Sequence, residues 1–311
     1  MRRSKLSVKS IIAPGVVAGA AFMPMAARGQ IFVVNSGNGT IGEYKLDGTT
    51  VATALVSGLS NPIAIAVSGP NLFVTNAGNG TVGEYTTSGG TVNASLITGL
   101  SNPVAIAVSG SNLFVNNGSS TVGEYTTSGG TVNASLITGV QSNTLGLAVS
   151  GSNLFVGTGY STIGEYTISA GTVTGSNTSF ITGLTDPGGF SVSGTNLVVV
   201  NEVSDANNHG LYPIGEYSTL TGQPVNSSLV TGANSPTGTV VSGTNLLVVD
   251  LDDGTVDEYP TSGGTTSTTF ITGLDFPEGI AVPEPSSCGL LAAGAVGLLT
   301  HRRRRNKIRA K

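Results

Sequence analysis

The sequence predicts an all-β fold, a six-bladed β-propeller of four-stranded blades, and three observations predict it. The pair Glu-Tyr recurs six times, at intervals of 40 to 51 residues. Each interval holds four short runs rich in β-branched or aromatic residues, bounded by Gly, Asn or Ser. Glycine is abundant at 46 residues and charged residues make up only 10% of the chain, which suits short strands and many turns. The pairs are Glu43-Tyr44, Glu84-Tyr85, Glu124-Tyr125, Glu165-Tyr166, Glu216-Tyr217 and Glu258-Tyr259.

Residues 1–29 are predicted to be a signal peptide. Four basic residues precede residue 10, an apolar stretch follows to residue 25, and small residues stand up to Gly29. This order is typical of a secretory signal cleaved just after Ala27 or Gly29. The alternative is an uncleaved membrane anchor, which Pro14, Pro24 and an apolar run shorter than about 20 residues disfavour.

Residues 30–282 are predicted to form the propeller. In the second unit the expected strands are 63–67, 72–74, 81–85 and 96–97, and turn compositions separate them. Four strands in a repeat of about 41 residues are typical of a propeller blade. The units at 81–100 and 121–140 differ only at Leu100 and Val140, so they indicate architecture or multivalent contact more than a catalytic site.

The phase of the repeat predicts how the ring closes. The first unit begins at Gln30 with a run that matches the second strand of a blade, so its inner strand is missing. The run 276–282, at the end of the repeats, aligns with 61–67 and supplies that strand. Pairing of this C-terminal strand with the N-terminal blade leaves no open sheet edge at the seam.

Charge is segregated along the chain. Five of the 13 basic residues precede residue 31 and seven follow residue 300, which leaves Lys45 alone between them. Sixteen of the 17 acidic residues lie in the propeller region, whose formal charge is therefore −15. Such a surface excludes nucleic acid as a partner, because that binding depends on cations that contact phosphates. Cys288 is the only cysteine, so the propeller has neither a disulfide framework nor a thiolate metal site.

Residues 283–311 combine three features in order at the C-terminus. An apolar run at 288–299 is too short, at about 18 Å as a helix, to be a good permanent span of a core about 30 Å thick. The arginines after it favour keeping this end on the cytoplasmic side. The motif residues are Pro283, Glu284, Pro285, Arg302, Arg303, Arg304 and Arg305.

This arrangement resembles the PEP-CTERM sorting signal. The resemblance implies export by the general secretory pathway, transient contact of the C-terminal helix with the inner membrane, and recognition by an exosortase-type membrane protease. It further implies release or attachment at the surface or extracellular matrix of an exopolysaccharide-making Gram-negative bacterium. The alternative is a fortuitous hydrophobic tail.

The repeat itself resembles the NHL-type propeller repeat. The likeness rests on the run Asn71-Leu72-Phe73-Val74-Thr75-Asn76, followed by a turn and Thr81-Val82-Gly83-Glu84-Tyr85. It implies the fold and carries no particular function.

One column of polar residues ends the second strand of each blade. Its turn is expected to open on the same face as the connections between blades, where a ring of amides and one carboxylate could bind a sugar or a protein loop. The alternative is that each side chain closes an Asx-turn on its own backbone. The column comprises Asn35, Asn76, Asn117, Thr158, Asn201 and Asp250.

The Glu-Tyr pairs form a second column. Alternation along a strand places the two side chains on opposite sheet faces. We expect a structural role, with Tyr packed between blades and Glu accepting hydrogen bonds from neighbouring hydroxyls, rather than a binding stripe.

Units five and six depart from the pattern. Unit five is longer, and its extra loop after Asn201 carries Glu202, Asp205 and His209, the only histidine outside the tail. Unit six contributes Asp250, Asp252 and Asp253 before Gly254, a candidate calcium turn whose spacing only partly matches a calcium loop. The alternatives are a solvated histidine and a solvated acidic turn.

These features predict an exported, non-enzymatic protein that binds polysaccharide or another surface protein through one rim. No Ser-His-Asp set is credible with a single histidine in the propeller, and cofactors other than calcium are not expected. The alternative is a calcium-dependent hydrolase or lactonase that resembles the gluconolactonases, whose axial site needs acidic inner strands; here Glu278 stands alone near the start of one. A third possibility is a scaffold that binds its partner through the unit-five loop.

Overall fold

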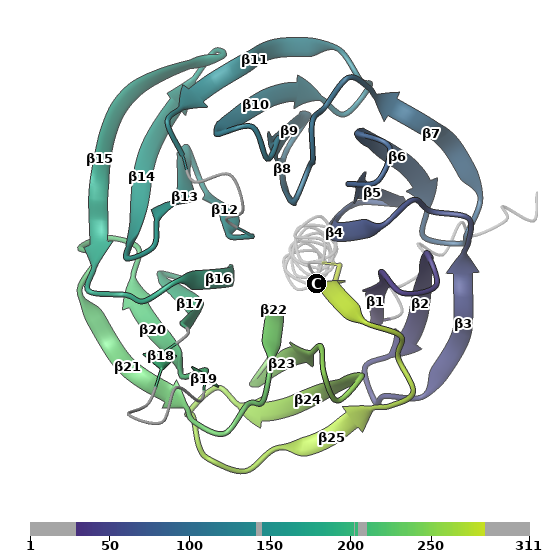
Figure 1. Cartoon of the computed structure of the whole chain (residues 1–311), viewed down its shortest axis with the longest axis vertical. Helices are drawn as coiled ribbons and strands as arrows, with labels where there is room; N and C mark the ends of the chain where they lie inside the picture. Colours follow the sequence, from purple (N-terminus) through teal and green to yellow (C-terminus); the bar gives the residue numbers. More distant parts are fainter. Residues whose placement is uncertain (1–28, 141–144, 202, 205–209, 284–311) are drawn as a thin grey trace, which may run out of the picture.

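The computed structural model describes residues 29–140, 145–201, 203–204 and 210–283. Within these ranges the chain forms six four-stranded antiparallel sheets arranged around a central axis (Figure 1). The predicted six-bladed β-propeller is therefore confirmed, and no helix occurs in the described ranges.

The second blade shows why the repeat folds as it does. From the axis outward it consists of β4 (Pro62–Ser68), β5 (Asn71–Asn76), β6 (Thr81–Thr86) and β7 (Thr91–Ile97). Tight turns join these strands, and Gly69 (φ 55°) supplies the left-handed conformation that the β4–β5 turn requires. The outer strand begins five residues earlier than the sequence predicted, because the polar residues at its start face solvent on the sheet edge.

The other blades repeat this order. In the third blade the strands are β8 (Ala105–Ser109), β9 (Asn112–Asn116), β10 (Thr121–Thr126) and β11 (Thr131–Thr138). The fourth has β12 (Leu147–Ser150), β13 (Asn153–Gly159), β14 (Thr162–Ser169) and β15 (Thr172–Thr182). The fifth has β16 (Pro187–Ser193), β17 (Asn196–Asn201), β20 (Ile214–Ser218) and β21 (Pro224–Val230). The sixth has β22 (Pro236–Ser242), β23 (Asn245–Asp250), β24 (Thr255–Pro260) and β25 (Thr268–Ile271).

The first blade closes the ring. It combines β1 (Gln30–Asn35), β2 (Thr40–Lys45) and β3 (Thr50–Val56) with β26 (Pro277–Ala281) as its inner strand. β26 pairs with β1 in the register Phe32 to Ala281 and Val33 to Ile280. The predicted closure by the C-terminal strand is confirmed.

The core lies between the blades. Each of six clusters of buried residues joins one blade to the next, and one tyrosine of the Glu-Tyr pairs belongs to each cluster. Tyr85 of the second blade, for example, packs with Phe32 and Ile41 of the first. A Cβ at Gly83 would lie only 2.7 Å from the Tyr85 ring, so a glycine two residues before the tyrosine leaves room for it. The expected packing of tyrosine between blades is confirmed.

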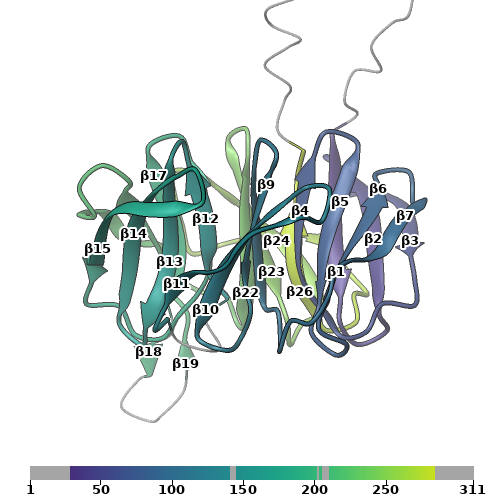
Figure 2. The same ribbon diagram turned by 90° about the horizontal axis from the view of Figure 1, so that it is seen from above.

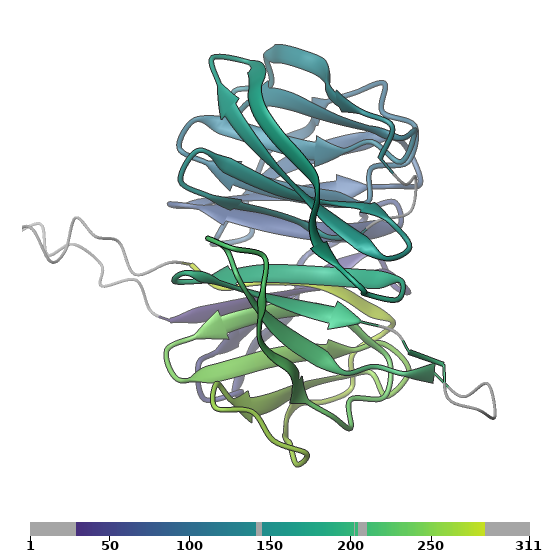
Figure 3. The same ribbon diagram turned by 90° about the vertical axis from the view of Figure 1, so that its left-hand side faces the viewer.

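The molecule has two distinct faces. We call the face with the inter-blade connections and the turns after the second strands the connector face; Ala77 N donates to Asn61 O there (3.0 Å), as expected. The described chain begins and ends on the opposite face, the terminus face (Figure 2). The small hairpin of β18 (Val203–Ser204) and β19 (Gly210–Leu211) projects from the connector face (Figure 3).

Several predicted segments fall beyond these ranges. Apart from Gly29 and Pro283, the predicted signal peptide and the motif residues of the sorting tail lie outside the described residues, and both assignments stay predictions. In the part of the chain that the structure describes, no helix is long and apolar enough to cross a membrane.

Candidate functional site

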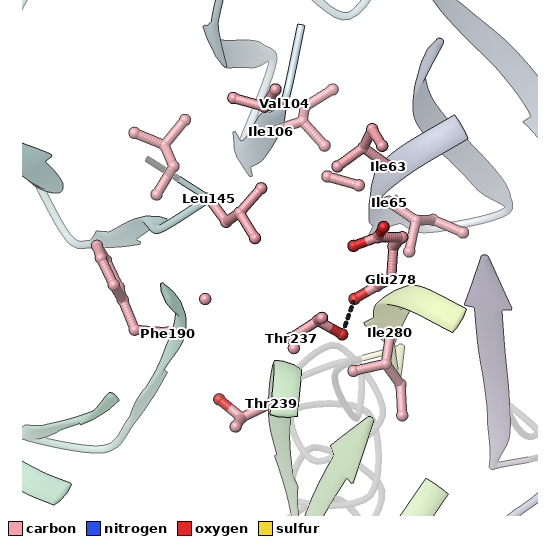
Figure 4. Close-up of a pocket in the computed structure, with 15 residues that line it drawn as sticks. Ile63, Ile65, Val104, Ile106, Leu145, Phe190, Thr237, Thr239, Glu278 and Ile280 are labelled. Carbon is pink, nitrogen blue, oxygen red and sulfur yellow. Dashed lines mark hydrogen bonds between the residues drawn. The ribbon is translucent and has the colours of Figure 1, made fainter. Parts of the chain in front are cut away.

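A cavity of about 90 Å³ lies on the propeller axis. The inner segments of all six blades line it, mostly with apolar side chains such as Ile63, Val104, Leu145 and Phe190 (Figure 4). The cavity exists because six inner strands converge without any one of them filling the axis.

Glu278 is the only ionisable residue that lines this cavity. It is the second residue of β26, and its carboxyl lies beside Ile63 and Ile65 at the edge of the central space (Figure 4). Burial raises the pKa of Glu278 to about 7, because the apolar walls disfavour its charged form. Among the described residues, no hydrogen bond or ion pair reaches the carboxyl.

The backbone around Glu278 is held firmly. The Thr237 hydroxyl donates to the main-chain oxygen of Glu278 at 3.0 Å, which ties β26 to the neighbouring inner strand (Figure 4). A Cβ at Gly238 would lie 2.9 Å from that same oxygen, and one at Gly279 would lie 2.7 Å from Ile63 O. Glycine therefore lets the inner strands approach one another closely beside the carboxyl.

Phe276 stands two residues before Glu278 and is 60% exposed. Its φ is 49°, in the left-handed region that a bulky side chain rarely adopts. Asn61 and Asp186 hold the equivalent position in other blades with φ of 47° and 46°, and these residue types tolerate that conformation far better. Ser36 N fixes the strained residue by donating to its carbonyl at 3.0 Å.

A second aromatic side chain, Tyr160, is 72% exposed in the turn after β13, on the same connector face. Tyr160 and Phe276 are the aromatic members of the exposed large hydrophobic residues in the described part of the chain. Exposed acidic residues share the face, at Asp186, Asp252 and Asp253. Lys45, the single cation of the propeller, ends β2 at the terminus face.

The predicted column of polar residues lies on the connector face but is engaged within the fold. Asn35, Asn76 and Asp250 are buried, and Asn117 and Asn201 are partly so. In four blades the side-chain oxygen accepts a backbone N–H of the connection that enters the same blade. These bonds run from Asp275 N to Asn35 Oδ1 (3.4 Å), Ser101 N to Asn117 Oδ1 (2.7 Å), Thr185 N to Asn201 Oδ1 (2.6 Å) and Asn234 N to Asp250 Oδ2 (2.9 Å).

Four of the six members of the column therefore anchor the connections between blades, whereas Asn76 Nδ2 donates to Thr81 Oγ1 at 3.3 Å. An Asx-type bond to the residue's own turn occurs at Asp250, whose Oδ1 accepts Asp253 N at 3.3 Å. Thr158 instead donates to Thr178 O at 3.0 Å. A role of this column in binding a ligand remains a prediction.

The acidic turn of unit six is spread out. Asp250 is buried and bonded to backbone N–H groups, whereas Asp252 and Asp253 are exposed. Within the described ranges, no three carboxylate, histidine or cysteine side chains come together as a metal site. Calcium binding stays a prediction, and its geometry here would rest on the two exposed carboxylates.

The glutamates of the Glu-Tyr pairs have a partner that the sequence reasoning misidentified. Each accepts a hydrogen bond from the carboxamide that begins the preceding strand, as in Asn71 Nδ2 to Glu84 Oε1 (2.8 Å), and not from a hydroxyl. The expectation of hydroxyl donors was wrong, because the antiparallel register places that carboxamide diagonally opposite the carboxylate. The equivalent donors are Gln30, Asn112, Asn153, Asn196 and Asn245.

Glu202, Asp205 and His209 of the unit-five loop lie outside the described residues, and their role stays a prediction. Phe276 was missed as a candidate, and Glu278 was noticed but set aside as an isolated carboxylate. The repeat alignment carried the signal: Phe276-Pro277-Glu278 stands where Asn61-Pro62-Ile63 stands in the second unit. The residues equivalent to Phe276 in the units that carry the proline are small and polar, and those equivalent to Glu278 are the uncharged Ile63, Val104, Gly188 and Thr237.

Comparison with known proteins supports the fold. No family model and no curated protein matches the sequence. A chain in the crystal structure of a nidogen/laminin complex is similar over 82% of this chain and 98% of its own, with 14% identity and a TM-score of 0.60. A gluconolactonase from Xanthomonas campestris is similar over 71% of this chain and 79% of its own, with 13% identity and a TM-score of 0.56. At these identities the chain shares the β-propeller architecture with both proteins.

Proposed function

We propose that this protein is an exported, non-enzymatic binding protein that engages a surface polysaccharide or protein through its connector face. Export and sorting to the cell surface or extracellular matrix rest on the two terminal segments, with an exosortase-type protease as the processing partner. The propeller is the part that binds.

The observation that carries this proposal is Phe276. A large aromatic side chain held in a left-handed conformation costs of order 1–3 kcal/mol. It is also 60% exposed, so it gains little from packing. A strained and exposed side chain on the connector face is best explained by a contact outside the molecule.

The surroundings of Phe276 support the same face. Tyr160 supplies a second exposed aromatic surface, and aromatic rings stack on sugars and anchor protein interfaces. The near-identity of residues 81–100 and 121–140 argues for a rigid scaffold in that part of the ring, which presents this one face.

A calcium-dependent hydrolase is the alternative, and similarity to a gluconolactonase fold raises it. That chemistry needs several carboxylate or amide ligands around the axis. Glu278 is the only carboxylate among the residues that line the cavity, so we favour binding over catalysis.

The test is binding of the full-length protein to glycan and peptide arrays, with the variant Phe276→Asn. Asparagine is the residue of the second blade at this position, so the backbone remains compatible. We expect the variant to lose at least tenfold in affinity for any ligand that the wild type retains.

Leu220→Ser is the matched control, because Leu220 is 76% exposed in the β20–β21 turn on the terminus face. Its binding should equal that of the wild type. Equal loss in both variants, or none in Phe276→Asn, would rule out the connector face as the binding surface.

A further inference from the structure

The axial cavity is suited to a slender group. A volume of about 90 Å³ is available to ligand atoms. On this measure roughly 10–15 Å³ is enough for one water molecule, so the cavity admits a chain of several atoms. The side chain of a lysine is slender enough to enter it.

The electrostatics of the cavity depend on one acidic group. Glu278 is its single carboxyl, and an ionised carboxylate among apolar walls is costly unless a counter-charge meets it. The strands packed against β26 are β1, β4, β22 and β23, and the only titratable side chain on these four is Asp250, which ends β23 and accepts backbone N–H groups. Across the axis, β8, β12 and β16 carry no titratable side chain, so these strands supply no counter-charge to Glu278.

The connector face around the cavity is also negatively charged. The connector face carries Asp186, Asp252 and Asp253 as exposed carboxylates, and no described cation lies on it, since Lys45 is at the terminus face. Fields of one sign around a low-dielectric cleft draw in an opposite charge. The complement of this face is a cationic partner.

We propose that the axial cavity is a binding site for the ammonium group of a lysine side chain, presented by a polypeptide that docks on the connector face. The inference rests on the proposed function and specifies its partner as a basic protein segment. Glu278 forms the ion pair with the ammonium at the bottom of the interface, and Phe276 stacks against the incoming segment.

The proposal makes binding depend on pH. With a pKa of about 7, Glu278 is mostly protonated near pH 6 and mostly ionised near pH 8. A lysine ammonium keeps its charge over this range. Affinity should therefore rise about tenfold from pH 6 to pH 8, following the ionised fraction of the carboxyl.

The experiment is titration of fluorescently labelled octalysine into the full-length protein, at low salt and at both pH values. The variants are Glu278→Gln and, as a matched control, Asp186→Asn, which removes one charge from the same face outside the cavity. Nζ-acetylated octalysine and an oligomer of glucosamine serve as comparison ligands.

We expect Glu278→Gln to lower octalysine affinity at least tenfold at pH 8 and to abolish the rise with pH, with Asp186→Asn changing it less than threefold. Acetylated peptide should not bind. If the two variants lower octalysine affinity equally, the peptide is attracted only by the overall negative charge of the connector face, and the proposal of a site in the cavity is overturned. Equal, Glu278-dependent binding of the glucosamine oligomer would overturn the assignment to a polypeptide.

The two proposals fail separately. If octalysine does not bind while the arrays yield a ligand that Phe276→Asn loses, the lysine site is refuted and the connector face stands. If Phe276→Asn leaves every ligand bound, the connector face itself is refuted.

Discussion

At the scale of the residue, Phe276 and Glu278 distinguish the point where the chain enters β26 from the points where it enters the other inner strands. The equivalent positions in the second unit are Asn61 and Ile63, which are respectively compatible with a left-handed backbone and with an apolar axis. Backbone strain at Phe276 and burial of the Glu278 carboxyl are both expected to reduce stability, so each is open to a direct measurement.

The first prediction concerns Glu278 and pH. The folded protein keeps this proton up to about pH 7, against an ordinary value of 4.5, so it binds more protons than the unfolded chain between these values. Stability from this group is therefore lost as pH rises through that window. Glu278→Gln should raise the free energy of unfolding near pH 8 by about 1–2 kcal/mol, after allowance for solvent screening, and leave it unchanged near pH 4.

Urea denaturation of wild type and variant at both pH values measures this difference. Burial also raises the pKa of Glu84, Glu124 and Glu165, so a slope of the same sign should remain in the variant. A variant that is equally stabilised at both pH values would show that Glu278 does not titrate in this way.

The second prediction concerns backbone strain. Phe276→Asn relieves the left-handed phenylalanine and should raise the free energy of unfolding by about 1 kcal/mol, while it weakens binding. Thermal unfolding followed by circular dichroism tests it, with Leu220→Ser as the surface control. A less stable Phe276→Asn would indicate that the ring packs favourably on its neighbours.

The third prediction concerns the Glu-carboxamide pairs. Glu124 is only 1% exposed, and Asn112 Nδ2 donates to its Oε1 at 2.8 Å. Asn112→Ala leaves this buried carboxylate without its donor, so it should cost about 1–3 kcal/mol of stability. Asn93→Ala, on an exposed strand, is the comparison and should change stability by less than about 0.5 kcal/mol. Equal destabilisation by the two substitutions would show that the hydrogen bond between Asn112 and Glu124 does not stabilise the fold.

The outer strands are the informative features at the scale of the element. β3, β7, β11, β15, β21 and β25 lie at the open edges of their sheets and carry no charged residue. Uncharged edges pair readily with other chains. Four of them limit this through an asparagine that binds the N–H two residues ahead, as in Ser95 N to Asn93 Oδ1 (3.1 Å). β3 has Ala52 at that position.

The fourth prediction follows from this difference. Asn93→Ala frees the Ser95 N–H on the edge and should increase aggregation, whereas Ala52→Asn should reduce any self-association of the wild type through β3. Light scattering at increasing concentration, on samples of equal thermal stability, measures both. Identical scattering of all three proteins would show that the side-chain caps do not protect the edges.

Ring closure decides stability at the scale of the whole molecule. Phe32 and Val33 of β1 are fully buried, and the axis-facing edge of this strand is covered by β26. A chain that ends at Leu274 loses β26 and exposes an apolar strand edge at the axis.

The fifth prediction is that this truncated chain loses cooperative unfolding or melts at least about 10 °C lower. A chain that ends at Pro283 keeps β26 and serves as the control, with the melting temperature of the full-length protein. Calorimetry of the three chains distinguishes closure from a general effect of removing the tail. Cooperative melting of the shorter chain at the control temperature would contradict the role of β26.

The sequence by itself determined the strands, their grouping into blades and the closure of the ring. These are local or periodic features. Alternation and turn residues define each strand, and the phase of the repeat shows that the inner strand of the first blade comes from the C-terminal end of the repeats. It also located the column of Asn35, Asn76, Asn117, Asn201 and Asp250 on the connector face. The hydrogen bonds to the connections could not be predicted, because three of them join residues 16 positions apart and the fourth joins Asn35 to Asp275, 240 positions away.

Only the tertiary structure decided where the candidate site lies. Glu278 is separated from Ile63, Val104 and Phe190 by long stretches of chain, and they meet because six inner strands converge on one axis. The pKa of Glu278 is a property of that convergence, since its burial comes from other blades. A single-repeat pattern describes a blade, whereas the cavity belongs to the ring.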